Sequence, residues 1–173
     1  MPPMRTGRGR DAEFTEYVTA RAPWLRQVAY LLCGDWHRAD DLVQTGVTKL
    51  YTNWHRASTA WNLDGYARKT VVNTFLAEQR TAWRRLVDLR HSQEELVARE
   101  SDHDAVLDLR AALGELPPRQ RATVVLRYFC DLPVAEVART LDCSAGTVKS
   151  QTAHAIETLR ARLRSEPIGT PEG

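Results

Sequence analysis

The segment from Asp131 to Leu163 constrains this chain most, because it predicts two helices joined by a tight turn. Apolar side chains recur at i, i+3, i+4 and i+7 from Val134, so they share one face of the first helix. Ser144 has the side chain of an N-cap for a second helix, from Ala145 to about Leu163. A short helix, a brief turn and a longer polar helix are typical of a helix-turn-helix, whose second helix enters the major groove. An ordinary helical hairpin is the alternative for this segment alone.

Charge is unevenly distributed along the 173 residues, although the net charge is only +2. Residues 66–90 contain six basic and two acidic side chains, and residues 119–164 contain eight basic and four acidic ones. Between them, residues 91–108 contain six acidic side chains and one arginine. Two basic blocks around an acidic strip predict two modules that face nucleic acid and a connector that avoids it. Each basic block alone could also be a solvated helix surface.

Helical spacing recurs from residue 13 onward without strand-like alternation, so we predict an all-α chain. It should form two small helical domains joined by a linker, the C-terminal one a helix-turn-helix. Pro23 predicts a break in the first helix, and residues 55–64 lack periodicity and predict a loop. The predicted organisation is a disordered tail over 1–12, a helical domain over 13–83, an acidic linker over 84–104, a second domain over 105–164 and a disordered tail over 165–173.

Composition argues against several other classes of protein. The three cysteines are isolated, which argues against a disulfide framework or zinc ribbon and fits a reducing cytoplasm. No apolar run follows the arginines of the first ten residues, so we expect no signal peptide and no membrane insertion. The chain also lacks a glycine-rich phosphate loop and metal-ligand spacing. We therefore expect no catalysis, no metal site and no cofactor.

Several sequence motifs, taken together, resemble those of one protein family. Leu116–Phe129, followed by Val134-Ala-Glu-Val-Ala and Cys143–Ser150, resembles region 4 of bacterial sigma factors. Ala39–Gln44 resembles region 2.2, and Tyr66–Thr74 resembles regions 2.3 and 2.4. The order, the spacing and the lack of a middle domain resemble the extracytoplasmic-function (group IV) sigma factors of the sigma-70 family. The resemblance extends from about residue 13 to residue 163.

This resemblance implies a cytoplasmic sigma factor that directs core RNA polymerase to promoters. Region 2 would melt and capture the −10 element, and region 4 would read the −35 duplex, to initiate transcription. An anti-sigma factor is a further implied partner. The linker would thread the polymerase's RNA exit path, although its acidic residues could simply keep it soluble. The alternative function is a stand-alone helix-turn-helix regulator that binds duplex DNA as a dimer.

Carried onto this sequence, the resemblance implies a −10 surface of aromatic, amide and basic side chains. The aromatic rings could stack on released bases and Asn73 could read a base edge, although a tryptophan in a small helical domain is often part of the core. The basic residues would neutralise phosphates. The predicted −10 residues are Trp61, Tyr66, Lys69, Thr70, Asn73, Thr74, Arg80, Arg84 and Arg85.

The resemblance also implies a −35 surface and a polymerase surface. The second helix of the helix-turn-helix would reach bases while arginines outside it hold the DNA backbone, and Gln151, where many relatives have arginine, predicts a changed preference. Asp40 and Asp41 could also cap a helix and complement its positive N-terminal end, and the two roles are compatible. The predicted −35 residues are Arg119, Arg121, Arg127, Ser144, Thr147, Lys149, Ser150, Gln151, Thr152 and His154. The predicted polymerase residues are Asp40, Asp41, Leu42, Gln44, Thr45 and Lys49.

Overall fold

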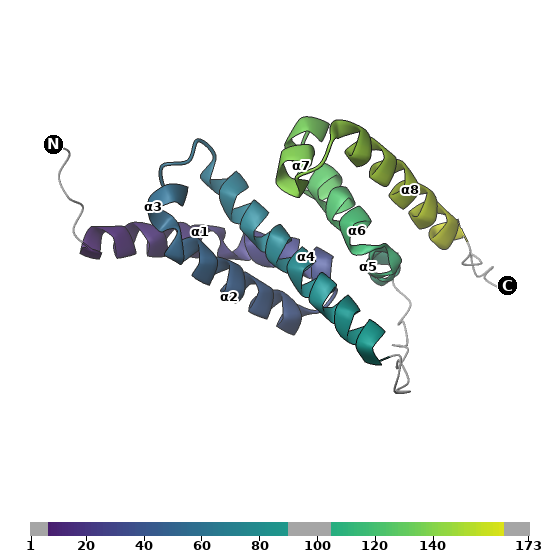
Figure 1. The fold of residues 1–173 in the computed structure, drawn as a ribbon, viewed down its shortest axis with the longest axis horizontal. Coiled ribbons are helices and arrows are strands. Elements are labelled where there is room, and N and C mark those ends of the chain that lie inside the picture. Colours follow the sequence, from purple (N-terminus) through teal and green to yellow (C-terminus); the bar gives the residue numbers. More distant parts are fainter. Residues whose placement is uncertain (1–6, 90–104, 165–173) are drawn as a thin grey trace, which may run out of the picture. The chain divides into compact units, whose positions relative to one another are not determined.

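The computed structural model describes residues 7–89 and 105–164, and within these ranges every regular element is a helix (Figure 1). The all-α prediction is therefore confirmed. The chain divides into two compact units, Met1–Phe75 and Leu76–Gly173. This division falls within one long helix, before the boundary that the sequence predicts at residue 84. The elements are α1 (Gly7–Cys33), α2 (Trp36–Thr52), α3 (Trp54–Ala57), α4 (Leu63–Leu89), α5 (Ala105–Glu115), α6 (Pro118–Val124), the π-helical turn η1 (Val125–Phe129), α7 (Val134–Leu141) and α8 (Ala145–Arg164).

Helix α1 begins earlier than predicted and continues through its proline. The prediction of a disordered tail is wrong for residues 7–12, because Arg10 donates to the carbonyl of Tyr51 (3.1 Å) and the Tyr51 hydroxyl donates to Asp11 (2.9 Å). The prediction of a break at Pro23 is also wrong. Pro23 and Thr19 are both exposed, so the Thr19 carbonyl that loses its helical donor faces water.

A tight turn and a close helix contact shape the N-terminal unit. Gly34 ends α1 with φ of 73°, a left-handed conformation that glycine adopts without strain, and its amide donates to Tyr30 (2.7 Å). Helix α2 then packs on α4 at Gly46, where an added Cβ would lie 3.0 Å from Val71. The largest fully buried side chains of this unit are Phe75, Leu25, Leu32, Leu42, Leu50, Val28, Val71 and Val72.

The segment between α2 and α4 is not the continuous loop predicted over 55–64. Its first residues form the four-residue helix α3, because Trp54 and Ala57 are buried and pull this turn onto the core. Helix α4 begins at Leu63, as predicted, where the Asn62 side chain accepts from the Gly65 amide (2.8 Å). It then runs to Leu89, beyond the predicted end at residue 83, through residues that carry no helix breaker.

The C-terminal unit contains the predicted helix-turn-helix, α7 and α8. Asp142 ends α7 in the left-handed conformation (φ 51°), and its amide donates to Ala138. Ser144 caps α8 as predicted, because its hydroxyl accepts from the Thr147 amide (3.1 Å). The buried side chains that hold the unit together are Leu113, Leu116, Leu126, Val137, Leu141, Val148 and Ala155.

Candidate nucleic-acid interfaces

A polar hollow of about 280 Å³ lies in the N-terminal unit where α2 faces α4. Four of the predicted −10 residues come together there, on successive turns of α4. Two residues at the C-terminal end of α2 and just after it complete the lining: one that the sequence assigned to the polymerase, and one that it missed. The lining residues are Tyr66, Thr70, Asn73 and Thr74 from α4, with Lys49 and Asn53 from the region of α2.

The hydroxyls of the hollow are already engaged within the protein. Thr70 donates to the Tyr66 carbonyl (2.9 Å), and Thr74 donates to the Thr70 carbonyl (2.7 Å). Thr74 is only 3% exposed, and its oxygen lies 3.1 Å from Nζ of Lys49. Thr74 therefore supports the floor of the hollow rather than offering a donor to a ligand, whereas Asn73 is exposed at its rim.

The positions of Lys49 and Asn53 were not expected from the sequence. Lys49 lies on the flank of α2 that faces α4, with its ammonium group against Thr74, rather than with the outward polymerase candidates. Asn53, one helical turn later, donates to the Lys49 carbonyl (3.0 Å) and was not predicted. The four-residue spacing of these two residues was a signal that they share a face.

Trp61 precedes the hollow's long helix and is fully exposed, at 104% of its reference area. The neighbouring α4 terminus is held rigidly: Tyr17 donates to Asp64 (2.9 Å), and Arg21 contacts the same carboxylate at 2.8 Å. Burial, with the hydrogen bond to Asp64, raises the pKa of Tyr17, so this phenol stays protonated as a donor. An unpacked indole beside a fixed helix end is available to stack on a base.

Basic side chains follow along α4. Lys69 is half-buried on the turn that also carries Thr70. The predicted phosphate contacts lie further on, where the helix surface is exposed on every residue from 81 to 89. Arg84 and Arg85 lie within this stretch and are exposed, and Arg80, just before it, is exposed as well.

The outer surface of α2 carries part of the predicted polymerase surface. Asp41, Gln44 and Thr45 are exposed on it, and the Thr45 hydroxyl donates to the Asp41 carbonyl (3.0 Å). Leu42 is 1% exposed and belongs to the core, so its prediction as an interface residue is wrong. Leucine at this position faces inward because it lies on the same face of the helix as the buried residues Ala39 and Gly46, at i−3 and i+4.

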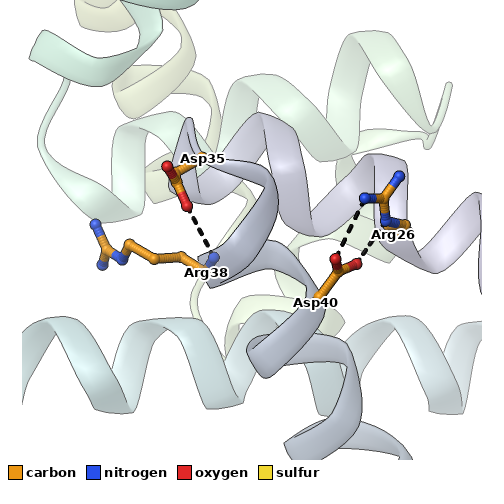
Figure 2. Close-up of polar contacts among 4 residues, drawn as sticks. All are labelled: Arg26, Asp35, Arg38 and Asp40. Carbon is orange, nitrogen blue, oxygen red and sulfur yellow. Dashed lines mark hydrogen bonds and ion pairs between the residues drawn. The ribbon is translucent and has the colours of Figure 1, made fainter.

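Asp40 is tied to α1 rather than free for a partner. Figure 2 shows Arg26 reaching across to Asp40, and the guanidinium donates to both carboxylate oxygens. This hydrogen bonding holds the pKa of Asp40 below its usual value. The helix cap is Asp35, which accepts from the Arg38 amide (2.9 Å), so the alternative that Asp40 and Asp41 cap the helix is wrong.

An aromatic pair that the sequence did not indicate supports this ion pair. The Tyr30 and Trp36 rings stack with centroids 3.8 Å apart and an interplanar angle of 11°. The guanidinium of Arg26 lies 4.3 Å from the centroid of Trp36. Arg26 is thus held by a ring on one side and a carboxylate on the other. Because Trp36 is 38% exposed, this arrangement forms part of the accessible surface.

In the C-terminal unit, α8 presents one continuous outward face. Val148 and Ala155 are buried against the rest of the unit, and the exposed positions lie on the opposite side. This face contains three of the predicted −35 residues and one small residue that was not predicted. In order they are Lys149, Ser150, Ala153 and His154.

Three other predicted −35 residues use their hydroxyl groups for contacts within α8 and its N-terminal cap. The Ser144 and Thr147 hydroxyls lie 2.9 Å apart at the N-terminus of α8, so both belong to the cap. Thr152 donates to the Val148 carbonyl (2.7 Å). These three side chains shape the helix end and its flank. Ser144 remains exposed at the start of the outward face.

Gln151 points toward α6 and away from the outward face. Its side-chain amide lies 3.0 Å from the hydroxyl of Thr123, which is fully buried. The prediction that Gln151 reads a base is therefore corrected: it lies between Val148 and Ala155 in the inward row of α8 and links two helices.

The three arginines predicted to hold the DNA backbone donate to carbonyls of their own chain. Arg119 reaches the Leu141 carbonyl at the end of α7 (2.7 Å), and Arg127 reaches the Leu132 carbonyl (2.6 Å). Arg121 donates to the carbonyls of Gly114 and Leu116 (both 3.0 Å). All three are half-buried. Helix ends leave carbonyls without helical donors, and Arg119 and Arg121 satisfy such carbonyls at the ends of α7 and α5.

Across residues 7–89 and 105–164, no three His, Cys, Asp or Glu side chains gather closely enough to hold a metal ion. None of the helices in these ranges has the length and apolar character needed to cross a bilayer. Residues 90–104, which make up most of the predicted acidic linker, lie outside the described residues, as do residues 1–6 and 165–173 of the predicted tails.

Comparisons with known proteins match both units. The Sigma-70 region 2 family matches residues 17–85, and the Sigma-70 region 4 family matches residues 107–159. The chain is 35% identical over 162 residues to the RNA polymerase sigma-E factor of Streptomyces coelicolor, covering 90% of this chain and 88% of that one. It is 30% identical over 149 residues to the ECF RNA polymerase sigma factor EcfG of Rhodopseudomonas palustris, covering 84% and 82%.

A solved structure shares the fold. The sigma factor RpoE from Bartonella quintana, in its complex with the anti-sigma factor NepR, superposes with a TM-score of 0.72. The two sequences are 24% identical, and the match covers 89% of this chain and 98% of that chain. The fold described above therefore occurs in an experimentally determined protein.

Proposed function

Since this chain belongs to the extracytoplasmic-function group of the sigma-70 family of RNA polymerase sigma factors, we propose that it opens promoters by dividing recognition between its two units. The hollow between α2 and α4 would capture an unstacked base of the −10 element. The outward face of α8 would read the −35 duplex. The observation that carries this proposal is the difference between the two surfaces, one hollow and one protruding.

Capture at −10 has to offset the cost of melting. Separating DNA strands costs about 1.4 kcal/mol per base-pair step on average. Stacking of one released base on an aromatic ring contributes roughly 1–3 kcal/mol, and the exposed Trp61 is free of ring contacts that it would have to give up. Asn73 at the rim supplies an amide that can donate to and accept from a base edge. Lys69, Arg80, Arg84 and Arg85 would neutralise the neighbouring phosphates.

Duplex reading at −35 requires side chains that reach the floor of the major groove. Lys149 can donate to guanine, Ser150 and His154 offer polar groups, and Ala153 lets the helix approach closely. Gln151 ties α8 to α6, and Arg119 ties α6 to the end of α7. Arg121 and Arg127 hold carbonyls of the segments that end α5 and precede α7. We therefore reassign them from contacts with DNA to positioning of the recognition helix.

The outer surface of α2 would bind core polymerase through Asp41, Gln44 and Thr45. The Arg26–Asp40 pair would hold its edge in place. The protein would contribute no catalytic group of its own, because the polymerase performs the chemistry. It would act in the cytoplasm, where promoters and polymerase meet. By analogy with the RpoE complex, an anti-sigma factor would bind the chain and block it.

Reconstituted run-off transcription tests this function. Core polymerase with the protein should produce transcripts from a subset of promoters, and thymines near −10 should become reactive to permanganate. Trp61→Ala should reduce that reactivity roughly tenfold without changing the unfolding midpoint. Equal transcription with and without the protein would contradict the proposal. A palindromic footprint by the isolated chain would instead favour a dimeric regulator.

A further inference from the structure

One side chain of α1 contacts both ends of the connecting segment, residues 53–62, which joins α2 to α4. The ring centroid of Tyr17 lies 5.7 Å from that of Trp54, near the start of the segment. The Tyr17 hydroxyl donates to Asp64 (2.9 Å), just beyond its end. Because Trp54 and Asp64 flank the segment, one phenol side chain closes it into a loop with fixed ends.

The two ends of the segment are held by different forces. Trp54 is 3% exposed and packs on Phe14 as well as on Tyr17, so apolar ring contacts hold the first end. Asp64 receives the Tyr17 hydroxyl and also contacts Arg21 (2.8 Å). The Arg21 and Asp64 side chains are 48% and 36% exposed, and an ion pair so open to water contributes little. The half-buried Tyr17 is therefore the main tie on the second end.

The connecting segment carries side chains on which strand capture depends. Trp61 is fully exposed near its end, and Asn53 at its start lines the hollow. Residues 58–62 follow α3 and lie outside any helix, so the position of Trp61 depends on where the ends of the segment are held. Any part of a binding site that must become ordered when the ligand arrives lowers the affinity. A segment with fixed ends avoids much of that cost.

We propose that Tyr17 is a positioning residue for strand capture: by joining Trp54 to Asp64, it holds the connecting segment in its capture position before DNA arrives. The inference rests on the proposed function, because it takes Trp61 as the ring on which a released base stacks. Tyr17 lies outside the lining of the hollow, so it acts through the segment and not on the base. Helix α1 would therefore contribute to promoter opening, a role that the sequence did not assign to it.

Holoenzyme binding to forked promoter DNA measures how much the captured base contributes. Each non-template −10 base is removed in turn to leave an abasic site, and one position should weaken wild-type binding by about tenfold, the factor expected for one lost stacking contact. Tyr17→Phe keeps the ring on Trp54 and removes only the hydroxyl on Asp64. It should reduce this ratio several-fold, by at most about tenfold, because one hydrogen bond to a charged group contributes about that factor.

Binding of Tyr17→Phe holoenzyme to the abasic fork should stay at the wild-type level. A segment that is no longer held loses affinity for the base, whereas the phosphate contacts of α4 do not depend on it. A ratio that Tyr17→Phe leaves unchanged would overturn the inference.

Two control variants separate this tie from the ion pair and from general stability. Arg21→Met removes the other contact to Asp64 and should change the ratio by less than about twofold, as expected for an exposed ion pair. Val28→Ala opens a cavity at a fully buried position about three helical turns beyond Tyr17, so it lowers stability but should keep the ratio. If either control reduces the ratio as much as Tyr17→Phe does, the inference is overturned.

Amide hydrogen exchange of the full chain without DNA tests whether the segment is held in advance. The Ser58 amide donates to the Trp54 carbonyl (2.8 Å) inside the segment, so its protection reports on this turn. Tyr17→Phe should lower protection at Ser58 and leave the middle of α2 protected. Equal protection of Ser58 in the wild type and in Tyr17→Phe would overturn the inference even if the base ratio falls, because the segment would then be held without the hydroxyl.

The proposed function fails in a different way. If no abasic position weakens binding by the wild-type holoenzyme, capture of a base is wrong and the role of Tyr17 falls with it. If one position does weaken binding but Tyr17→Phe keeps the ratio, only the role of Tyr17 is wrong. The two failures are therefore read from different samples in the same assay.

Discussion

The two units solve different recognition problems with the same kind of element. In the N-terminal unit, candidate residues from α2 and α4 surround a common hollow, and the fully exposed Trp61 precedes α4. In the C-terminal unit, candidate residues come from α8 alone and point outward. A base removed from the stack needs a concave site, whereas an intact major groove needs a protruding helix. The two surfaces therefore differ mainly in shape, and less in the types of polar side chain that they present.

Removing a buried ring from the N-terminal unit gives the largest expected effect. Trp54 is 3% exposed and its ring centroid lies 5.2 Å from that of Phe14, so Trp54→Ala should destabilise this unit by about 3–5 kcal/mol. Amide hydrogen exchange on the full chain would show loss of protection in α1, α2 and the start of α4. Protection in α7 and α8 should remain. Loss of protection in both units together would show that they fold as one.

The next prediction separates support from DNA contact in the C-terminal unit. Arg119→Met removes a hydrogen bond from a charged donor to Leu141, so the unit should lose about 1.5–3 kcal/mol of stability. Lys149→Met is the matched control, because Lys149 is exposed on α8 and its loss should leave stability unchanged. Chemical denaturation compares the two. If Arg119 holds a phosphate instead, stability should be unchanged and the salt dependence of −35 binding should fall by about one ion.

The helix-turn-helix was predictable from sequence because its signals are local. Apolar spacing, the Ser144 cap and the break at Asp142 each act within a few residues, and α7 has the bounds that this spacing implies. The inward position of Gln151 also follows from its place between Val148 and Ala155. The polar character of glutamine does not indicate this, because a polar side chain can lie on either face of a helix.

Contacts between distant segments were not predictable in the same way. A long side chain can reach many acceptors, so the Leu141 carbonyl that Arg119 reaches depends on how segments 22 residues apart pack together. The Lys49–Thr74 contact likewise depends on how α2 crosses α4. The tail at residues 7–12 is helical because of a tertiary contact with Tyr51, which overrides a glycine-rich composition.

The two units also use different residues at their left-handed turns. The N-terminal unit has Gly34 (φ 73°), whereas the C-terminal unit has Asp131 (φ 53°) and Asp142 (φ 51°). Gly34→Ala should therefore destabilise the first unit by about 1 kcal/mol. Asp131→Gly should stabilise the second by a smaller amount, because glycine removes the Cβ strain. Thermal unfolding followed by unit-specific exchange measures both. A stabilising Gly34→Ala would contradict the assigned backbone strain.

The smallest expected effect tests whether the outward face of α8 reads shape as well as charge. Ala153 lies among Lys149, Ser150 and His154, and its methyl group can contact the 5-methyl group of thymine. Burying one methyl contributes about 0.8 kcal/mol, so replacing the contacted thymine by deoxyuridine should weaken −35 binding roughly fourfold. Ala153→Gly lowers affinity for both duplexes through its helix propensity but should remove the difference between them. If deoxyuridine weakens the glycine variant as much as the wild type, the thymine contact belongs to another residue. If no position responds to the loss of its methyl, α8 reads the groove through its polar side chains alone, and the two units resemble each other more than their shapes suggest.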